Sequence, residues 1–167
     1  MADKKTDSKN LKKATFGMGC FWHSEEMFDK IDGVKETKVG FMGGKVDKPT
    51  YKMVCGGDTG HAEVVQVTYD QKKLKYENLL EAFWNSHNPT TMNRQGLDIG
   101  EQYRSVVFYH DEEQKKTAEN VKKKLDDSGK FGNKIVTAIE PATEFYMAED
   151  YHQKYYEKQK GKTFGLF

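Results

Sequence analysis

Residues 13–31, KATFGMGCFWHSEEMFDKI, join two kinds of secondary structure through a sharp bend. Residues 13–18 are predicted to form a short strand, and the glycine at position 19 marks a turn. Residues 20–31 carry apolar side chains at helical spacing, so we expect an amphipathic helix that ends at Gly33. A strand that leads directly into a helix is the basic unit of an α/β fold.

Cys20 lies at the first turn of this predicted helix. Unpaired backbone N–H groups and the positive end of the helix dipole lower the pKa of a thiol at such a position, which favours the thiolate. The bulky rings of Phe21 and Trp22 follow directly. They are compatible with a small pocket for an apolar group beside a nucleophile, and equally with ordinary packing in the core.

The rest of the chain continues the alternation of strands and helices. Further strands are expected at residues 34–41, 61–69, 104–110 and 135–139, and further helices at 76–87, 111–129 and about 148–160. Long loops at 42–60 and 88–102 interrupt the pattern, and loops of that length in a compact domain are usually functional or disordered. This order favours an α/β (α+β) two-layer sandwich, a ferredoxin-like mixed sheet covered by helices.

Length and composition exclude several classes of protein. The 167 residues suffice for one domain at 13–167, preceded by a charged lead-in at 1–12 that we expect to be disordered. Lys and Arg number 27 against 26 Asp and Glu, so nucleic acid and acidic membranes are not expected as partners. No apolar run approaches the roughly 18 residues of a membrane helix, and no secretory signal is evident. A cytoplasmic monomer is the expectation.

The two cysteines, Cys20 and Cys55, exclude a disulfide framework and a structural metal site. Two are too few for the former, and they lack the close spacing and histidine partners of the latter. No metal is therefore expected. At this stage either cysteine could be catalytic, and both could be inert buried thiols.

Several polar residues come from the long loops or the strand between them. Glu63 alternates with Val65 and Val67 on one face of the predicted strand 61–69, so its carboxyl points either into the interior, where its pKa would rise, or to solvent at the strand end. Asp98 lies between glycines and could be a turn residue or a site residue. Together with Tyr51, Tyr103 and Cys20, these carboxyls could form one site at one end of the sheet.

Five sequence blocks, in order, resemble the peptide methionine sulfoxide reductase A family. The blocks are GCFW at 19–22, the glutamate at position 25, YKMVCGGDTGHAEVV at 51–65, HNPTTMNRQGLDIGEQYRS at 87–105 and AEDYHQKY at 148–155. Each block alone is a weak signal, but the ordered set is specific. The resemblance covers nearly the whole domain.

The resemblance implies reduction of the S epimer of methionine sulfoxide, free or in an oxidised protein. Cys20 is then the nucleophile that attacks the sulfoxide sulfur, and Glu63 is the acid that protonates its oxygen. The hydroxyls of Tyr51 and Tyr103 would donate to the same oxygen, and Asp98 would help to hold the substrate. By the same resemblance, the rings that follow the nucleophile, Phe21 and Trp22, would hold the sulfoxide methyl group.

This chemistry leaves the nucleophile as a sulfenic acid, which a second thiol must remove. Relatives often carry resolving cysteines in a C-terminal tail, whereas this sequence ends KGKTFGLF. Either Cys55 resolves the sulfenic acid and a thioredoxin reduces the disulfide, or an external thiol does so directly, which we favour. No cofactor is expected beyond that external reductant, thioredoxin or similar.

Two histidines allow other interpretations. His23 stands where relatives most often have Gly, and it is either a tolerated surface residue or one that tunes the thiolate. His61 belongs to the family-like TGHAE block and is expected to be structural, although Cys20, His61 and Asp98 could also form the nucleophile, base and acid of a cysteine hydrolase. A non-enzymatic thiol sensor is the third alternative.

Overall fold

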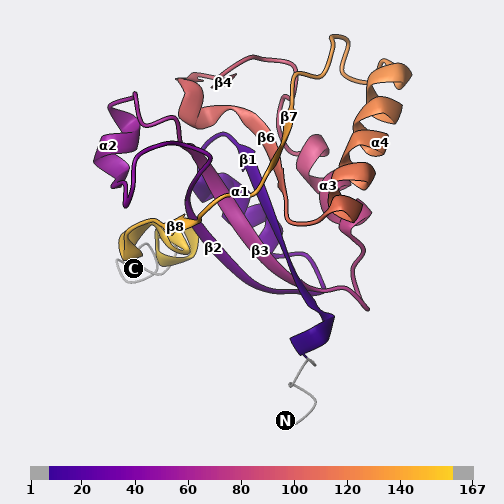
Figure 1. The fold of residues 1–167 in the computed structure, drawn as a ribbon, viewed down its shortest axis with the longest axis horizontal. Helices are drawn as coiled ribbons and strands as arrows, with labels where there is room; N and C mark the ends of the chain where they lie inside the picture. Colours follow the sequence, from indigo (N-terminus) through magenta and orange to yellow (C-terminus); the bar gives the residue numbers. More distant parts are fainter. Residues whose placement is uncertain (1–7, 160–167) are drawn as a thin grey trace, which may run out of the picture.

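The structure, a computed structural model, describes residues 8–159. Its central unit is a βαββαβ fold (Figure 1). The elements of this unit are β1 (Leu11–Met18), α1 (Phe21–Asp29), β2 (Val34–Met42), β3 (Ala62–Asp70), α3 (Tyr76–Asn85) and β6 (Ser105–Tyr109). Each lies close to the position that the periodicity predicts, so the local pattern and the tertiary packing agree.

Further elements flank this unit, and several of the short ones were not predicted. They are the 3₁₀ turns η2 (Ser8–Asn10), η3 (Glu101–Tyr103) and η4 (Asp150–His152), the helices α2 (Tyr51–Cys55) and α4 (Glu112–Ser128), and the strands β4 (Arg94–Gln95), β5 (Asp98–Ile99), β7 (Ala138–Pro141) and β8 (Tyr146–Met147). The turn η2 lies inside the stretch expected as a lead-in, whose residues 1–7 are outside the described part. Only α4 follows the prediction closely, with Asp111 as its N-cap and Gly129 as its left-handed C-cap.

The sheet order confirms the predicted fold class. Six strands run in the order β7-β6-β1-β3-β2-β8. The inner four pair antiparallel, whereas β6 and β7 pair parallel, so the sheet is mixed. The inner order β6-β1-β3-β2 is the ferredoxin-like arrangement of a βαββαβ unit, because each helix carries the chain across one intervening strand.

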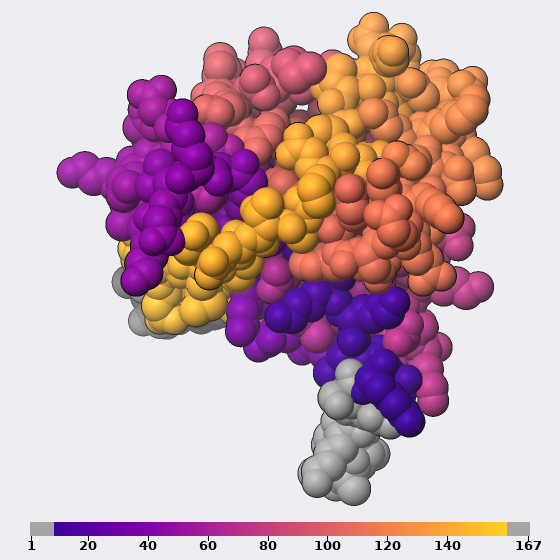
Figure 2. Space-filling view, viewed as in Figure 1, coloured from indigo at the N-terminus to yellow at the C-terminus, as the bar shows by residue number. Residues whose placement is uncertain are grey.

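Apolar side chains cover both faces of this sheet. On the helical face, the ring of Phe16 lies 5.1 Å from the rings of both Phe28 and Phe83, which joins β1 to α1 and α3. On the other face, Phe108 and its neighbours are covered by a segment that includes Phe145. Figure 2 shows that segment as a yellow-orange band across the molecule. Within residues 8–159, no helix combines the length and the apolar character needed to cross a bilayer.

The predicted helix at 148–160 is wrong over its first half. Lys154 has a left-handed φ of 56°, and only residues 155–159 are helical; residue 160 lies outside the described part. Tertiary hydrogen bonds override the local propensity, because the Gln153 side chain bonds both backbone groups of Val39, and the backbone N–H of Lys154 donates to Glu25.

The predicted strand at 135–139 is shifted toward the C-terminus. The backbone N–H of Val136 donates to the carbonyl of Pro89, outside the sheet, so pairing with β6 begins only at Ala138. The strand β7 then ends at Pro141. The reason is that tertiary contacts, invisible in the local pattern, take the N–H groups before the strand: that of Val136 bonds the loop at Pro89, and that of Ile135 donates to the Asp126 carboxylate.

The strand register brings the loop residues to one end of the sheet. Met18 at the end of β1 pairs with Ser105 at the start of β6, and Met42 at the end of β2 pairs with Ala62 at the start of β3. The bend after β1, which contains Cys20, and both long loops therefore leave the sheet at the same end of its strands, as the sequence predicted.

Candidate active site

The bend between β1 and α1 places Cys20 at this end of the sheet. Cys20 is the N-cap of α1, with φ −59° and ψ 122°, and its carbonyl accepts hydrogen bonds from the N–H groups of His23 and Ser24. The preceding Gly19 has a φ of 99°, which a residue with a Cβ rarely adopts. A Cβ there would also lie 2.8 Å from Cγ of Gln95, so Gly19 lets the β4–β5 hairpin pack over the bend.

The Cys20 thiol has a raised pKa, of about 11, contrary to the expectation from its helix position. Burial is the largest cause, and the nearby carboxyls of Glu63 and Asp98 raise the pKa further. Backbone N–H groups of Trp22 and His23 act in the expected direction and lower it, but desolvation outweighs them. The free protein therefore holds a thiol at neutral pH, and the thiolate must form as the substrate reacts.

Glu63 at the start of β3 is buried, with 1% of its surface exposed, which excludes the solvated strand end. Its Oε1 accepts from the backbone N–H of Phe21 at 3.3 Å, and its Oε2 has no hydrogen-bond partner among the described residues. Burial raises the pKa of this carboxyl to about 8, opposed by the Phe21 bond and reinforced by the charge of Asp98. At neutral pH it is mainly a carboxylic acid with a proton to give.

Two tyrosine hydroxyls surround the same carboxyl. Tyr51 is the first residue of α2 and Tyr103 the last of η3. Burial is the largest cause that raises the pKa of each, and the charge of Glu63 contributes to both. Both hydroxyls are neutral donors at any physiological pH.

The loop residues Asp98 and Cys55 complete the cluster. Asp98 is exposed on β5, and its charge acts on Cys20, Glu63 and Tyr103. Cys55 is an exposed free thiol at the end of α2, and its side chain hydrogen-bonds to Tyr51. The two long loops thus bring their polar residues to one place.

The two rings after the nucleophile have different environments. Phe21 is fully buried, and its ring centroid lies 6.1 Å from that of Tyr51. Trp22 is half-buried; its indole N–H donates to Nδ1 of His152 at 3.0 Å, and its ring stacks on Tyr155 at 3.8 Å. Sequence reasoning assigned no role to His152 or Tyr155, although both belong to the block AEDYHQKY at 148–155.

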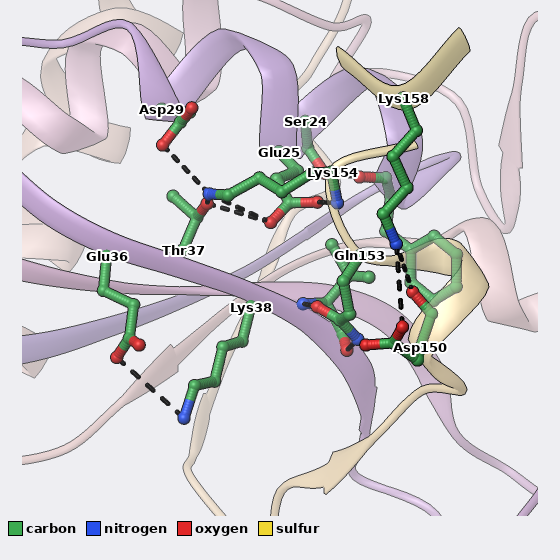
Figure 3. Close-up of polar contacts among 12 residues, drawn as sticks. Ser24, Glu25, Asp29, Glu36, Thr37, Lys38, Asp150, Gln153, Lys154 and Lys158 are labelled. Carbon is green, nitrogen blue, oxygen red and sulfur yellow. Dashed lines mark hydrogen bonds and ion pairs between the residues drawn. The ribbon is translucent and has the colours of Figure 1, made fainter. Parts of the chain in front are cut away.

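A buried ionic cluster holds that C-terminal segment against α1 (Figure 3). Glu25 is 2% exposed and accepts from the Thr37 hydroxyl at 2.9 Å and from the backbone N–H of Lys154 at 2.6 Å. The Lys154 ammonium lies 3.5 Å from the Glu25 carboxylate and 3.0 Å from that of Asp29. This cluster fixes the segment whose aromatic residues contact Trp22.

The chain is similar to known enzymes over nearly its whole length. The sequence profile described as peptide methionine sulfoxide reductase matches residues 12–165. A protein of Methanoculleus marisnigri described as peptide methionine sulfoxide reductase MsrA is 60% identical over 153 residues, which are 92% of this chain and 93% of the relative. The chain belongs to the peptide methionine sulfoxide reductase A family.

Solved structures agree with this assignment. Mxr1 from Saccharomyces cerevisiae in its reduced form is 42% identical, with a TM-score of 0.87 over 93% of this chain and 90% of that protein. Mxr1 in complex with Trx2 is 31% identical, with a TM-score of 0.64 over 90% of this chain and 88% of that protein. The fold is therefore that of the reductase family.

Membership in this family does not favour the hydrolase, and the geometry of His61 argues against it as well. Its Nδ1 accepts from the backbone N–H of Gly44 at 3.0 Å, and its Nε2 lies 2.7 Å from the carbonyl of Val46. Both ring nitrogens are occupied by the loop at 43–46, so His61 has no lone pair for Cys20. Its expected structural role is confirmed.

Among residues 8–159 no group of three or more His, Cys, Asp or Glu side chains is placed to hold a metal ion. The polar groups of the site are two carboxyls, two hydroxyls and two thiols, which together suit proton donation to an oxygen beside a sulfur nucleophile.

Proposed function

We propose that this reductase acts on the S epimer of methionine sulfoxide, free or in oxidised proteins, with Cys20 as nucleophile and Glu63 as acid. The observation that carries the assignment of roles is the protonated, buried Glu63 carboxyl, whose second oxygen has no protein partner within the described residues. A sulfoxide oxygen placed there would accept the proton that this oxygen carries.

In the first half of the reaction the Cys20 sulfur attacks the sulfoxide sulfur. Glu63 protonates the sulfoxide oxygen, which weakens the S–O bond, and the thiol proton of Cys20 restores Glu63. Oxygen passes to Cys20 as the S–O bond breaks. Methionine leaves with its sulfur reduced by two electrons, and Cys20 becomes a sulfenic acid, oxidised by two.

The other site residues select and orient the substrate. Tyr51 and Tyr103 donate neutral hydrogen bonds to the oxygen, so its developing charge is stabilised on more than one side. Phe21 and Trp22 provide the apolar pocket for the sulfoxide methyl, and Asp98 holds the polar end of the substrate. Because the methyl pocket and the oxygen donors are fixed relative to Cys20, one sulfur configuration fits.

In the second half a thiol returns Cys20 to its reduced form. A thioredoxin-like protein is the proposed reductant, since the yeast relative Mxr1 forms a complex with Trx2. Cys55 is exposed and shares the site, yet burial raises the pKa of its thiol, so few thiolates form at neutral pH. We favour direct attack by the external thiol. No prosthetic group is proposed, and we expect the protein to act as a monomer.

One experiment tests the reaction and another the resolving step. Separated S and R sulfoxides are assayed with dithiothreitol; the S epimer is expected to turn over with wild type and not with Cys20→Ser. Turnover of neither epimer, or undiminished turnover by the variant, would overturn the assignment.

Mass spectrometry after one turnover is expected to show Cys20 without a disulfide to Cys55, and an intramolecular disulfide would instead identify Cys55 as the resolving thiol.

A further inference from the structure

A cavity of about 330 Å³ opens onto Cys20. Its lining includes Met18, Cys20, His23, Met27, Ser86 and Asp98. The acid Glu63, both site tyrosines and the rings of the methyl pocket do not line it. Cys20 is therefore accessible from a direction in which the residues of sulfoxide reduction, apart from Asp98, are absent, and a cavity of this size suits a small ligand or a single side chain.

The helix α1 explains why His23 faces this cavity. Positions 20, 23, 24 and 27 repeat at intervals of three and four residues, so their side chains share one face of the helix, and all four line the cavity. Across from them stand the end of α3 and the β4–β5 hairpin, through Ser86 and Asp98. His23 and Cys20 are thus neighbours on one helix face.

His23 is the histidine whose ring is available for proton transfer. The ring is exposed, and its Nδ1 and Nε2 lie 3.2 Å and 3.1 Å from the hydroxyl of Tyr156. The hydroxyl oxygen can accept from the one ring nitrogen that carries a proton, and the other ring nitrogen then keeps its lone pair free to take a proton. Burial is the largest cause that raises the pKa of Tyr156, and the nearby charges of Cys20 and Asp98 raise it further.

The other histidine of the cavity is unsuitable as a base. His87 places Nδ1 2.6 Å from the Phe83 carbonyl and Nε2 2.7 Å from the Ser105 hydroxyl. Burial lowers its pKa to about 4, so it is a weak base as well as a fully bonded one.

We propose that the external thiol reaches Cys20 through this cavity and that His23 acts as the general base for it. The proposal rests on the proposed function, which leaves Cys20 as a sulfenic acid. Sulfoxide reduction needs an acid, which Glu63 supplies, whereas the attacking thiol must lose a proton. The two halves of the cycle then use different groups on different sides of one sulfur.

The step balances. His23 takes the proton of the incoming thiol, and the resulting thiolate attacks the Cys20 sulfur. An S–S bond forms, the S–O bond breaks, and the departing hydroxide takes the proton back from His23 to leave as water. A second equivalent of thiol then releases Cys20 as a thiol and carries away the disulfide.

Rapid mixing separates the two halves of the catalytic cycle in the His23→Ala variant. Reduced enzyme mixed with methionine-S-sulfoxide without reductant measures the first half as methionine formed in one turnover. Dithiothreitol added afterwards measures recovery of the free Cys20 thiol. The first rate is expected to match wild type, and recovery is expected to slow on the order of 10- to 100-fold. His110→Ala, an exposed histidine remote from the site, is the matched control and is expected to change neither rate.

Two further measurements distinguish a base from a structural residue. Added imidazole is expected to restore much of the recovery rate of His23→Ala. The defect is also expected to shrink when 2-mercaptoethanol is replaced by trifluoroethanethiol, because the electron-withdrawing fluorines make this thiol a much stronger acid that depends less on a base.

A third variant tests the route. Ser86→Trp places a bulky residue at an exposed position of the cavity wall, and it is expected to raise the KM for dithiothreitol without altering methionine formation.

The recovery of Cys20 is then measured with reduced thioredoxin in place of dithiothreitol, which shows whether a protein thiol uses the same route. The same defect in His23→Ala would extend the inference to thioredoxin. A normal recovery rate with thioredoxin would limit the route to small thiols. Normal recovery with small thiols, no rescue by imidazole, or an equal loss in both halves would overturn the proposal. If wild type forms no methionine in the single turnover, the proposed function itself has failed, which is a different outcome.

Discussion

Two glutamates of this protein are equally buried and have opposite surroundings. Glu63 and Glu25 are 1% and 2% exposed. Glu25 receives the Thr37 hydroxyl, a backbone N–H and the Lys154 ammonium (Figure 3). Glu63 receives one backbone N–H, faces the negative charge of Asp98, and keeps one oxygen without a protein partner among the described residues.

The comparison shows that burial alone does not decide what a carboxyl does. Burial penalises the charged form at both positions, and the partners determine whether that penalty is offset. At position 25 donors and a cation complete the group, and it anchors the C-terminal segment. At position 63 they are missing, and the group is left with a proton and an open oxygen at the substrate site.

The largest expected effect comes from removing the proton of Glu63. Glu63→Gln keeps the shape and cannot act as an acid, so we expect turnover of methionine-S-sulfoxide to fall roughly 100-fold or more below pH 8. The deficit should shrink above pH 8, where wild type also loses its acid. Steady-state rates from pH 6 to 9.5 check this, and a rate equal to wild type at pH 7 would contradict the acid role.

The second prediction concerns stability and the same residue. The Glu63 pKa is 4.5 in the unfolded chain and about 8 in the folded protein, so between these values only the folded state holds the proton. Stability therefore falls as pH rises through this window, on the order of 5 kcal/mol in total. Glu63→Gln does not lose stability in this way. Its free energy of unfolding in urea, relative to that of wild type, should therefore increase between pH 5 and pH 8. Parallel pH curves would refute it.

The third prediction concerns the other buried glutamate, Glu25, and its contribution to stability. Glu25→Ala leaves the backbone N–H of Lys154 without its acceptor and removes a buried ion pair, so we expect a loss of about 2–3 kcal/mol in the free energy of unfolding. Activity per folded molecule should fall less, because the residue touches no reacting atom. Urea unfolding measures the first quantity, and Lys123→Ala, which breaks an exposed pair with Asp127, is the control. A loss as small as that of the control would show that the cluster anchors nothing.

The smallest effect is expected from the neutral donors. Tyr103→Phe removes one hydroxyl while Glu63 and Tyr51 remain, so a decrease of about fivefold in kcat/KM is expected, equivalent to about 1 kcal/mol. Tyr51→Phe should behave similarly, and the double variant should lose more than either. Steady-state kinetics with the S epimer checks this, and a Tyr103→Phe enzyme as impaired as Glu63→Gln would mean that the hydroxyl is the acid.

Local pattern predicted the long elements and failed for the short ones. Strand alternation at 61–69 and helical spacing at 76–87 are strong signals, and β3 and α3 follow them closely. The five-residue helix α2 and the β4–β5 hairpin lie inside predicted loops, because such short elements have too few periods to be recognised. The segment after Ala148 was misjudged because distant groups, Glu25 and Val39, decide its backbone conformation.

Motif order and periodicity were enough to assign the family and the βαββαβ order and to name the candidate site residues, because both are properties of the chain. Tertiary structure alone decided the ionisation of the site. A helix N-terminus predicted a lowered pKa for Cys20, and burial raised it; alternation could not tell whether Glu63 faced solvent, and burial made it an acid. Desolvation and nearby charge depend on atoms far apart in sequence, which only the folded chain brings together.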